Sequence, residues 1–121
     1  MAKAFYSDVV KHYMRRWLLY VDGNGERLSD EQIRTELTAR TPAGKPIRLQ
    51  PLHSEAFTAC TTAFKRLEPD DRAKIVYVYS HPAGLVPAVK QVAADEDIPT
   101  SAVWATLARF ERSVAKLANL V

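Results

Sequence analysis

The chain has few of the residues that define several common protein classes. Its one cysteine, Cys60, excludes an internal disulfide and any zinc site built from several cysteines. The three histidines, at positions 12, 53 and 81, are scattered, and none has a second histidine or a cysteine at helical spacing. No apolar run has the length of a membrane span or the pattern of a signal peptide. We therefore expect a cytoplasmic protein with no cofactor, no metal and no membrane partner.

Groups arranged for catalysis are missing as well. None of the serines lies in a nucleophile-elbow sequence, and Cys60 falls on an apolar helical face, where burial raises the pKa of a thiol. The acidic run Asp95-Glu96-Asp97 matches neither a calcium-binding loop nor a carboxylate pair for acid–base chemistry, because no second cluster accompanies it. We expect no enzymatic activity.

The composition that remains is that of an ordinary globular domain with a small basic excess. Apolar residues make up 47% of the 121 positions and charged residues 26%, enough for one domain with its own core. The net charge of +3 permits nucleic-acid binding without demonstrating it. Basic residues predominate at both ends of the chain, in residues 1–21 and 98–121.

Hydrophobic periodicity predicts an all-α domain of five to six helices. Residues 3–21 repeat apolar side chains at steps of four, and Ser29 with Gln32 forms a capping box that opens a helix over residues 30–40. Helices are also predicted over residues 54–67 and 70–80. The second of these contains Ile75-Val76-Tyr77-Val78-Tyr79, a composition typical of strands, but a lone strand would have no partner. Asp22-Gly23-Asn24-Gly25 predicts a turn.

The C-terminal stretch, residues 86–121, has the pattern of a short helix, a tight turn and a long helix that runs to the C-terminus. Apolar residues of the long helix recur at steps of three and four, which predicts a buried face made of Val103, Leu107, Phe110, Val114, Leu117 and Val121. The opposite face carries Ser101, Ala105, Ala108, Arg109, Arg112 and Lys116. Small residues allow close approach to a DNA groove, and arginine and lysine reach bases and phosphates.

The turn itself fits a helix-turn-helix motif in most positions. Pro99 suits the start of a helix, and Val92, Ala93, Ile98 and Val103 occupy the apolar positions of the motif. Glu96 stands where an apolar residue is usual, and Asp97 stands where glycine usually makes the turn, although aspartate tolerates the left-handed conformation. The alternative is that the last two helices simply pack as a hairpin within an all-α domain.

These motifs resemble two families of transcription proteins. The segments Leu-Glu-Pro-Asp-Asp-Arg, Ile-Val-Tyr-Val-Tyr and Ile-Pro-Thr-Ser-Ala-Val, between residues 67 and 103, are similar to region 4 of bacterial sigma factors. The chain resembles still more the zinc-free Q-type late-gene antiterminators of phages and prophages, whose tryptophan-bearing N-terminal helix is similar to Tyr13-Met14-Arg15-Arg16-Trp17. This resemblance implies a protein that binds DNA beside a promoter, loads onto paused RNA polymerase and allows it to read through terminators.

The expected organisation is a single helical domain, 1–121, with N-terminal helices and a basic, proline-rich loop in residues 1–50 and a helix-turn-helix part in residues 51–121. The predicted DNA-contacting residues, five of which follow from the resemblance, are Lys90, Thr100, Ser101, Trp104, Ala105, Arg109, Arg112 and Lys116. Charge and expected mobility suggest a contact with polymerase or RNA through either the loop around Lys45 and Arg48 or the helix with Arg15 and Arg16.

The resemblance implies three partners: double-stranded DNA, bacterial RNA polymerase with its sigma factor, and nascent RNA at the exit channel. Two other functions stay open on the sequence. One is a simple promoter-binding repressor or activator, and the other is a helical protein-interaction module whose basic face is merely solvated.

Overall fold

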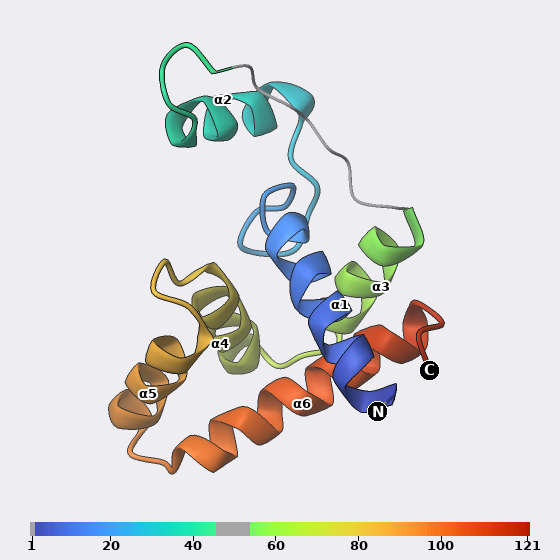
Figure 1. Ribbon diagram of the computed structural model, residues 1–121, viewed down its shortest axis with the longest axis vertical. Coiled ribbons are helices and arrows are strands. Elements are labelled where there is room, and N and C mark those ends of the chain that lie inside the picture. The colour runs from blue at the N-terminus through green and yellow to red at the C-terminus, as the bar shows by residue number, and fades with distance from the viewer. Residues whose placement is uncertain (1, 46–53) are drawn as a thin grey trace.

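The computed structural model describes residues 2–45 and 54–121, with side chains for residues 6–39, 41–45 and 54–121. Within these ranges the chain forms six α-helices and no strand, which confirms the all-α prediction (Figure 1). The helices are α1 (Ala2–Trp17), α2 (Asp30–Arg40), α3 (Ser54–Lys65), α4 (Pro69–Ser80), α5 (Leu85–Glu96) and α6 (Thr100–Leu117). None of the described helices is both long and apolar enough to cross a membrane.

The first helix ends earlier than its periodicity predicts, at Trp17 rather than Val21. The backbone N–H groups of Leu19 and Tyr20 make turn bonds to residues three positions back, which tighten and close the helix. Val21 then forms an isolated antiparallel bridge with Arg27. The apolar periodicity predicts too long a helix because Val21 is buried through this pairing rather than on a helical face.

The predicted turn at residues 22–25 is confirmed, and Gly25 has a specific reason to be glycine. Its φ of 79° lies in the left-handed region, and a Cβ atom there would come within 2.9 Å of Cδ2 of Phe64. The Phe64 ring packs against the fully buried Trp17, with ring centroids 5.0 Å apart. Trp17 also donates a hydrogen bond from Nε1 to Oγ1 of Thr61, 2.9 Å away. The turn therefore closes over an aromatic contact between α1 and α3.

Two other local predictions are confirmed. The Ser29 side chain accepts a bond from the Gln32 backbone N–H at 3.2 Å, and the Gln32 side chain accepts one from the Ser29 N–H at 3.0 Å, so α2 begins with a complete capping box. The run of residues 75–79 is helical, as part of α4, and buries Ile75, Val78 and Tyr79.

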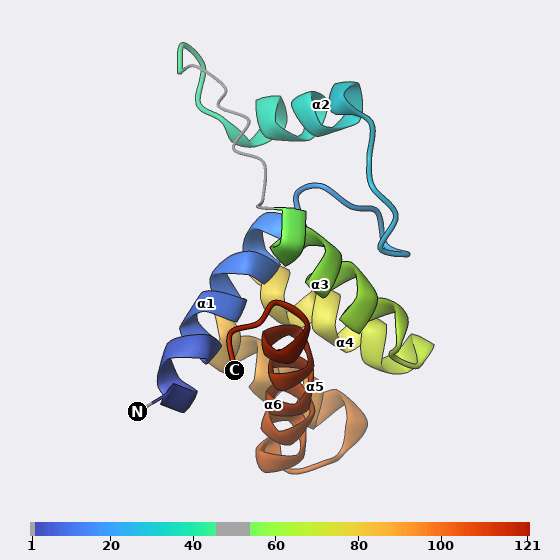
Figure 2. The same ribbon diagram turned by 90° about the vertical axis from the view of Figure 1, so that its right-hand side faces the viewer.

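The longest helix, α6, organises the core. It contacts α1, α3 and α5, while α4 packs on α1 and α5. Figures 1 and 2 show α2 at the opposite end of the molecule from α6. The predicted buried face of α6 is confirmed over Val103, Leu107, Phe110 and Val114, each at most 3% exposed.

The prediction that the last helix runs to the C-terminus is wrong. The helix ends at Leu117, and Asn119 takes a left-handed conformation with φ of 59°. The Leu120 backbone N–H then bonds back to the Ala115 carbonyl at 2.8 Å, which satisfies a carbonyl group of the last turn. Val121, expected on the buried face, is instead 63% exposed.

Candidate nucleic-acid interface

The turn between α5 and α6 is built on Asp97, whose φ of 53° and ψ of 50° are left-handed, a conformation that aspartate tolerates in place of the usual glycine. The backbone N–H of Ile98 bonds to the Ala93 carbonyl at 3.0 Å, and that of Asp97 bonds to the Ala94 carbonyl at 3.4 Å. These bonds satisfy orphan carbonyls at the end of α5, and Pro99 at the N-cap starts α6. The two helices are thus joined by three residues.

The apolar positions assigned to the turn motif lie on the inner side of this helix pair. Val92 and Ala93 of α5 are 7% and 6% exposed, Val103 of α6 is 2% exposed, and Ile98 is half-buried against the core. The inner faces of α5 and α6 therefore pack together, which fixes α6 relative to the domain. Its other side is left for solvent or a partner.

The outer side of α6 carries every α6 residue that the sequence assigns to DNA contact. The Trp104 side chain is 38% exposed although it is large and apolar. The exposed Arg109 donates a long bond of 3.4 Å from Nη2 to Oγ1 of Thr106 on the same helix. Exposed residues along this side, which we call the outer face of α6, are Thr100, Ser101, Trp104, Ala105, Ala108, Arg109, Arg112 and Lys116. Lys90 is likewise exposed, on α5.

The one acidic residue of α6, Glu111, points inward and is 6% exposed. Its Oε1 accepts a hydrogen bond from the Ser7 hydroxyl at 2.7 Å, and its Oε2 accepts one from the Tyr79 hydroxyl at 2.6 Å. Lys11 Nζ lies 3.9 Å from Oε2 and donates to Ser7 Oγ at 2.8 Å. Burial, followed by the charge of Glu111, raises the pKa of Tyr79 well above its ordinary value.

This network has two consequences for the interface. It ties α6 to α1 and α4 through a satisfied buried carboxylate, and it removes negative charge from the outer face of α6. Sequence reasoning missed Glu111, although position 111 flanks the apolar stripe, four residues after Leu107. A charged residue at the edge of a buried stripe is the signal that could have identified it.

The unusual Glu96 is explained by a contact between helices. Its Oε1 lies 3.0 Å from Nζ of Lys74 on α4, and Lys74 also lies 3.6 Å from Oδ1 of Asp71. Hydrogen bonding to Glu96 raises the pKa of Lys74, so its ammonium group stays charged. An ion pair at the surface thus occupies the position where the motif usually has an apolar side chain.

The other predicted contacts lie elsewhere. Arg15 is exposed and Arg16 is half-buried on α1, Lys45 is exposed after α2, and Arg48 falls outside the described residues. The segment that follows α2, which includes Lys45, lies at the opposite end of the molecule from α6 (Figures 1 and 2). The structure therefore does not join Lys45 and the outer face of α6 into one surface.

Chemical reactivity is low at the one thiol. Cys60 is fully buried, and burial raises its pKa from 9.0 to about 12, which disfavours the nucleophilic thiolate. Among the side chains described, no three His, Cys, Asp or Glu residues converge as metal ligands would.

Comparisons of the chain with protein families, with curated proteins and with solved structures found no match.

Proposed function

We propose that this protein is a DNA-binding transcription regulator that contacts duplex DNA through the outer face of α6. The observation that carries this proposal is the separation of charge on that helix. Arg109, Arg112 and Lys116 are exposed on one side, and the acidic Glu111 is buried on the other. A continuous cationic helix surface suits the phosphates that line a DNA groove.

The order of residues along this face also suits a groove. Its first turns carry Ser101 and Ala105, whose short side chains allow the helix backbone to approach base edges. Trp104, exposed beside them, offers an apolar surface to sugars and thymine methyl groups. The longer Arg109 and Arg112 follow one and two turns later, where they would reach phosphates or guanine edges. The buried pairing of α5 with α6 would hold this helix rigid during binding.

Within this class, we propose transcription antitermination as the specific role, and the support is the resemblance to Q-type antiterminators. The protein would bind beside a promoter, load onto paused RNA polymerase with its sigma factor, and extend or narrow the RNA exit channel. Terminator hairpins would then fail to form. This role needs a further surface for polymerase or RNA, and the exposed Arg15 on α1 and Lys45 after α2, neither of which belongs to α6, are candidates for it.

Purified transcription tests this proposal. A template would carry a candidate promoter region and a terminator well downstream, and read-through would be measured with the wild-type chain, with Arg109→Ala/Arg112→Ala, and with Arg15→Ala/Lys45→Ala. We expect the wild type to raise read-through and the first variant to lose DNA binding and read-through together. The second variant should keep DNA binding and lose read-through.

Two other results would assign a different function to the protein. A change in initiation without any change in read-through would identify a simple activator or repressor. If the wild type neither binds DNA nor co-purifies with polymerase, the protein is neither kind of regulator, and the basic face of α6 is only solvated.

A further inference from the structure

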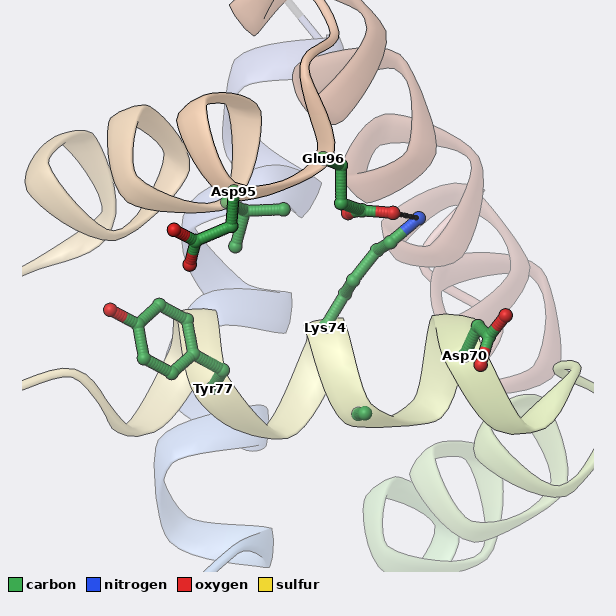
Figure 3. Close-up of a pocket in the computed structure, with 7 residues that line it drawn as sticks. Asp70, Lys74, Tyr77, Asp95 and Glu96 are labelled. Atoms are coloured by element: carbon green, nitrogen blue, oxygen red, sulfur yellow. Dashed lines mark ion pairs between the residues drawn. The ribbon is translucent and has the colours of Figure 1, made fainter.

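A shallow pocket lies between α4 and the end of α5, on a part of the surface that the DNA-binding proposal does not use (Figure 3). Its volume is about 430 Å³, within the range of natural binding pockets. The lining includes the buried Val92 and the half-buried Lys74. Tyr77 also lines the pocket, and 40% of the Tyr77 surface is exposed. His81 packs edge-on against the Tyr77 ring, with centroids 5.4 Å apart.

Charge in this pocket is opposite to that of the molecule as a whole. Three carboxylates line it, those of Asp70, Asp95 and Glu96, against the single ammonium group of Lys74. That ammonium group is already engaged by Glu96 at 3.0 Å and by Asp71 at 3.6 Å. The pocket is therefore acidic on a protein whose net charge is +3.

Figure 3 shows how these groups are arranged. The Tyr77 ring and the Asp95 carboxylate stand on the same side of the pocket, and Asp70 lies at the other end of α4. Gln91 donates a hydrogen bond to Oδ1 of Asp95 at 2.8 Å, which orients the carboxylate without neutralising it. An aromatic ring beside an oriented carboxylate is the arrangement that binds a guanidinium or ammonium group, through cation–π contact and charged hydrogen bonds.

We propose that this pocket, which we call the α4–α5 pocket, receives an arginine or lysine side chain from a basic segment of a partner protein. The cationic head would lie over Tyr77 and bond to Asp95, and its aliphatic stem would cover the exposed Ala73. The open shape suits a side chain presented by a polypeptide better than a small molecule, which needs deeper enclosure. DNA is excluded because its phosphates would meet carboxylates. The site stands apart from the outer face of α6 and does not rest on DNA binding.

The probe is a fluorescein-labelled peptide with arginines spaced along an alanine–glycine background, and its binding to the full chain is followed by fluorescence anisotropy. Two variants test the pocket: Tyr77→Ala, and the isosteric Asp95→Asn, which keeps the size of the side chain. The matched control is Asp30→Asn, which removes another exposed carboxylate, from α2.

We expect the arginine peptide to bind and a citrulline version, neutral but of the same shape, to bind at least about tenfold more weakly. Each pocket variant should weaken binding by about tenfold, and Asp30→Asn should leave it unchanged. Duplex binding by all three variants should equal that of the wild type, which separates this site from the outer face of α6.

Several outcomes would overturn the proposal. One is equal binding of the arginine and citrulline peptides, and another is no binding of either. A third is an equal loss of peptide affinity in Asp95→Asn and Asp30→Asn, which would indicate attraction to the overall charge of the protein rather than to the pocket. A concentration-dependent dimer in sedimentation that Asp95→Asn abolishes, without effect on the peptide, would assign the pocket to a second copy of this chain instead.

Discussion

Removing the hydroxyl group of Tyr79 should destabilise the protein far more than removing that of Tyr77, two residues earlier on the same helix. Tyr79 is 5% exposed and donates its hydroxyl proton to Oε2 of Glu111 at 2.6 Å. Tyr77 is 40% exposed, so water can replace any bond that its hydroxyl loses. Both substitutions to phenylalanine delete one oxygen atom and keep the ring, which makes them a matched pair.

The loss of stability in Tyr79→Phe can be worked out from the contacts that Glu111 would still have. The residue is 6% exposed, and its carboxylate would keep the Ser7 bond at 2.7 Å and the Lys11 ammonium group at 3.9 Å. A hydrogen bond to a charged group contributes about 1.5–3 kcal/mol, so we expect Tyr79→Phe to cost about 2 kcal/mol. A change of this size lowers the Tm of a domain of this length by roughly 8 °C. Tyr77→Phe should stay within about 0.5 kcal/mol of the wild type.

Urea unfolding followed by circular dichroism gives both values from the same fit. A double-mutant cycle with Glu111→Gln then tests the pair directly, because Tyr79→Phe should cost less when the carboxylate is already an amide. If the two phenylalanine variants have the same stability, or if the cycle shows no coupling, then Glu111 does not join α4 to α6 as described.

Three further predictions concern the turns and the buried thiol. Gly25→Ala should cost about 2 kcal/mol in urea unfolding, because of its positive φ and the clash with Phe64, whereas Gly23→Ala, with open space around it, should be nearly neutral. Asp97→Gly should raise stability by about 1 kcal/mol, since glycine adopts the left-handed conformation without strain; a decrease would show that the aspartate side chain contributes to the turn. Burial raises the pKa of Cys60 from 9.0 to about 12, so the unfolded chain loses this proton first and stability should fall as pH rises through that interval. Cys60→Ala should make the fall shallower, as measured by unfolding at each pH.

Local signals in the sequence were sufficient for most of the helices. The capping box at Ser29 depends on side chains three residues apart, and the buried face of α6 depends on periodicity, so neither requires knowledge of the tertiary fold. The left-handed conformation of Asp97 is likewise a property of the turn itself. The predicted ends of helices were less accurate because backbone hydrogen bonds of the following turn compete with those of the helix, as after Trp17 and Leu117.

Contacts between distant segments could not be predicted from periodicity. Ser7 and Glu111 are 104 positions apart, and the Lys74–Glu96 pair joins two helices whose packing the sequence does not specify. The acidic α4–α5 pocket follows from that packing, so the sequence alone showed only an acidic run at residues 95–97. The exposure of the outer face of α6, in contrast, could be anticipated, because it is the complement of the apolar stripe.

The central claim, that the outer face of α6 binds duplex DNA, is tested most directly by the salt dependence of duplex affinity. The comparison is between Arg109→Ala/Arg112→Ala and Arg34→Ala/Arg66→Ala, which removes the same charge from exposed positions off α6. We predict a steep fall of affinity with salt for the wild type and the second variant. The first variant should bind more weakly, and its slope of log K against log salt should be smaller by about two. Equal slopes for the two variants, or affinity that does not change with salt, would contradict the claim.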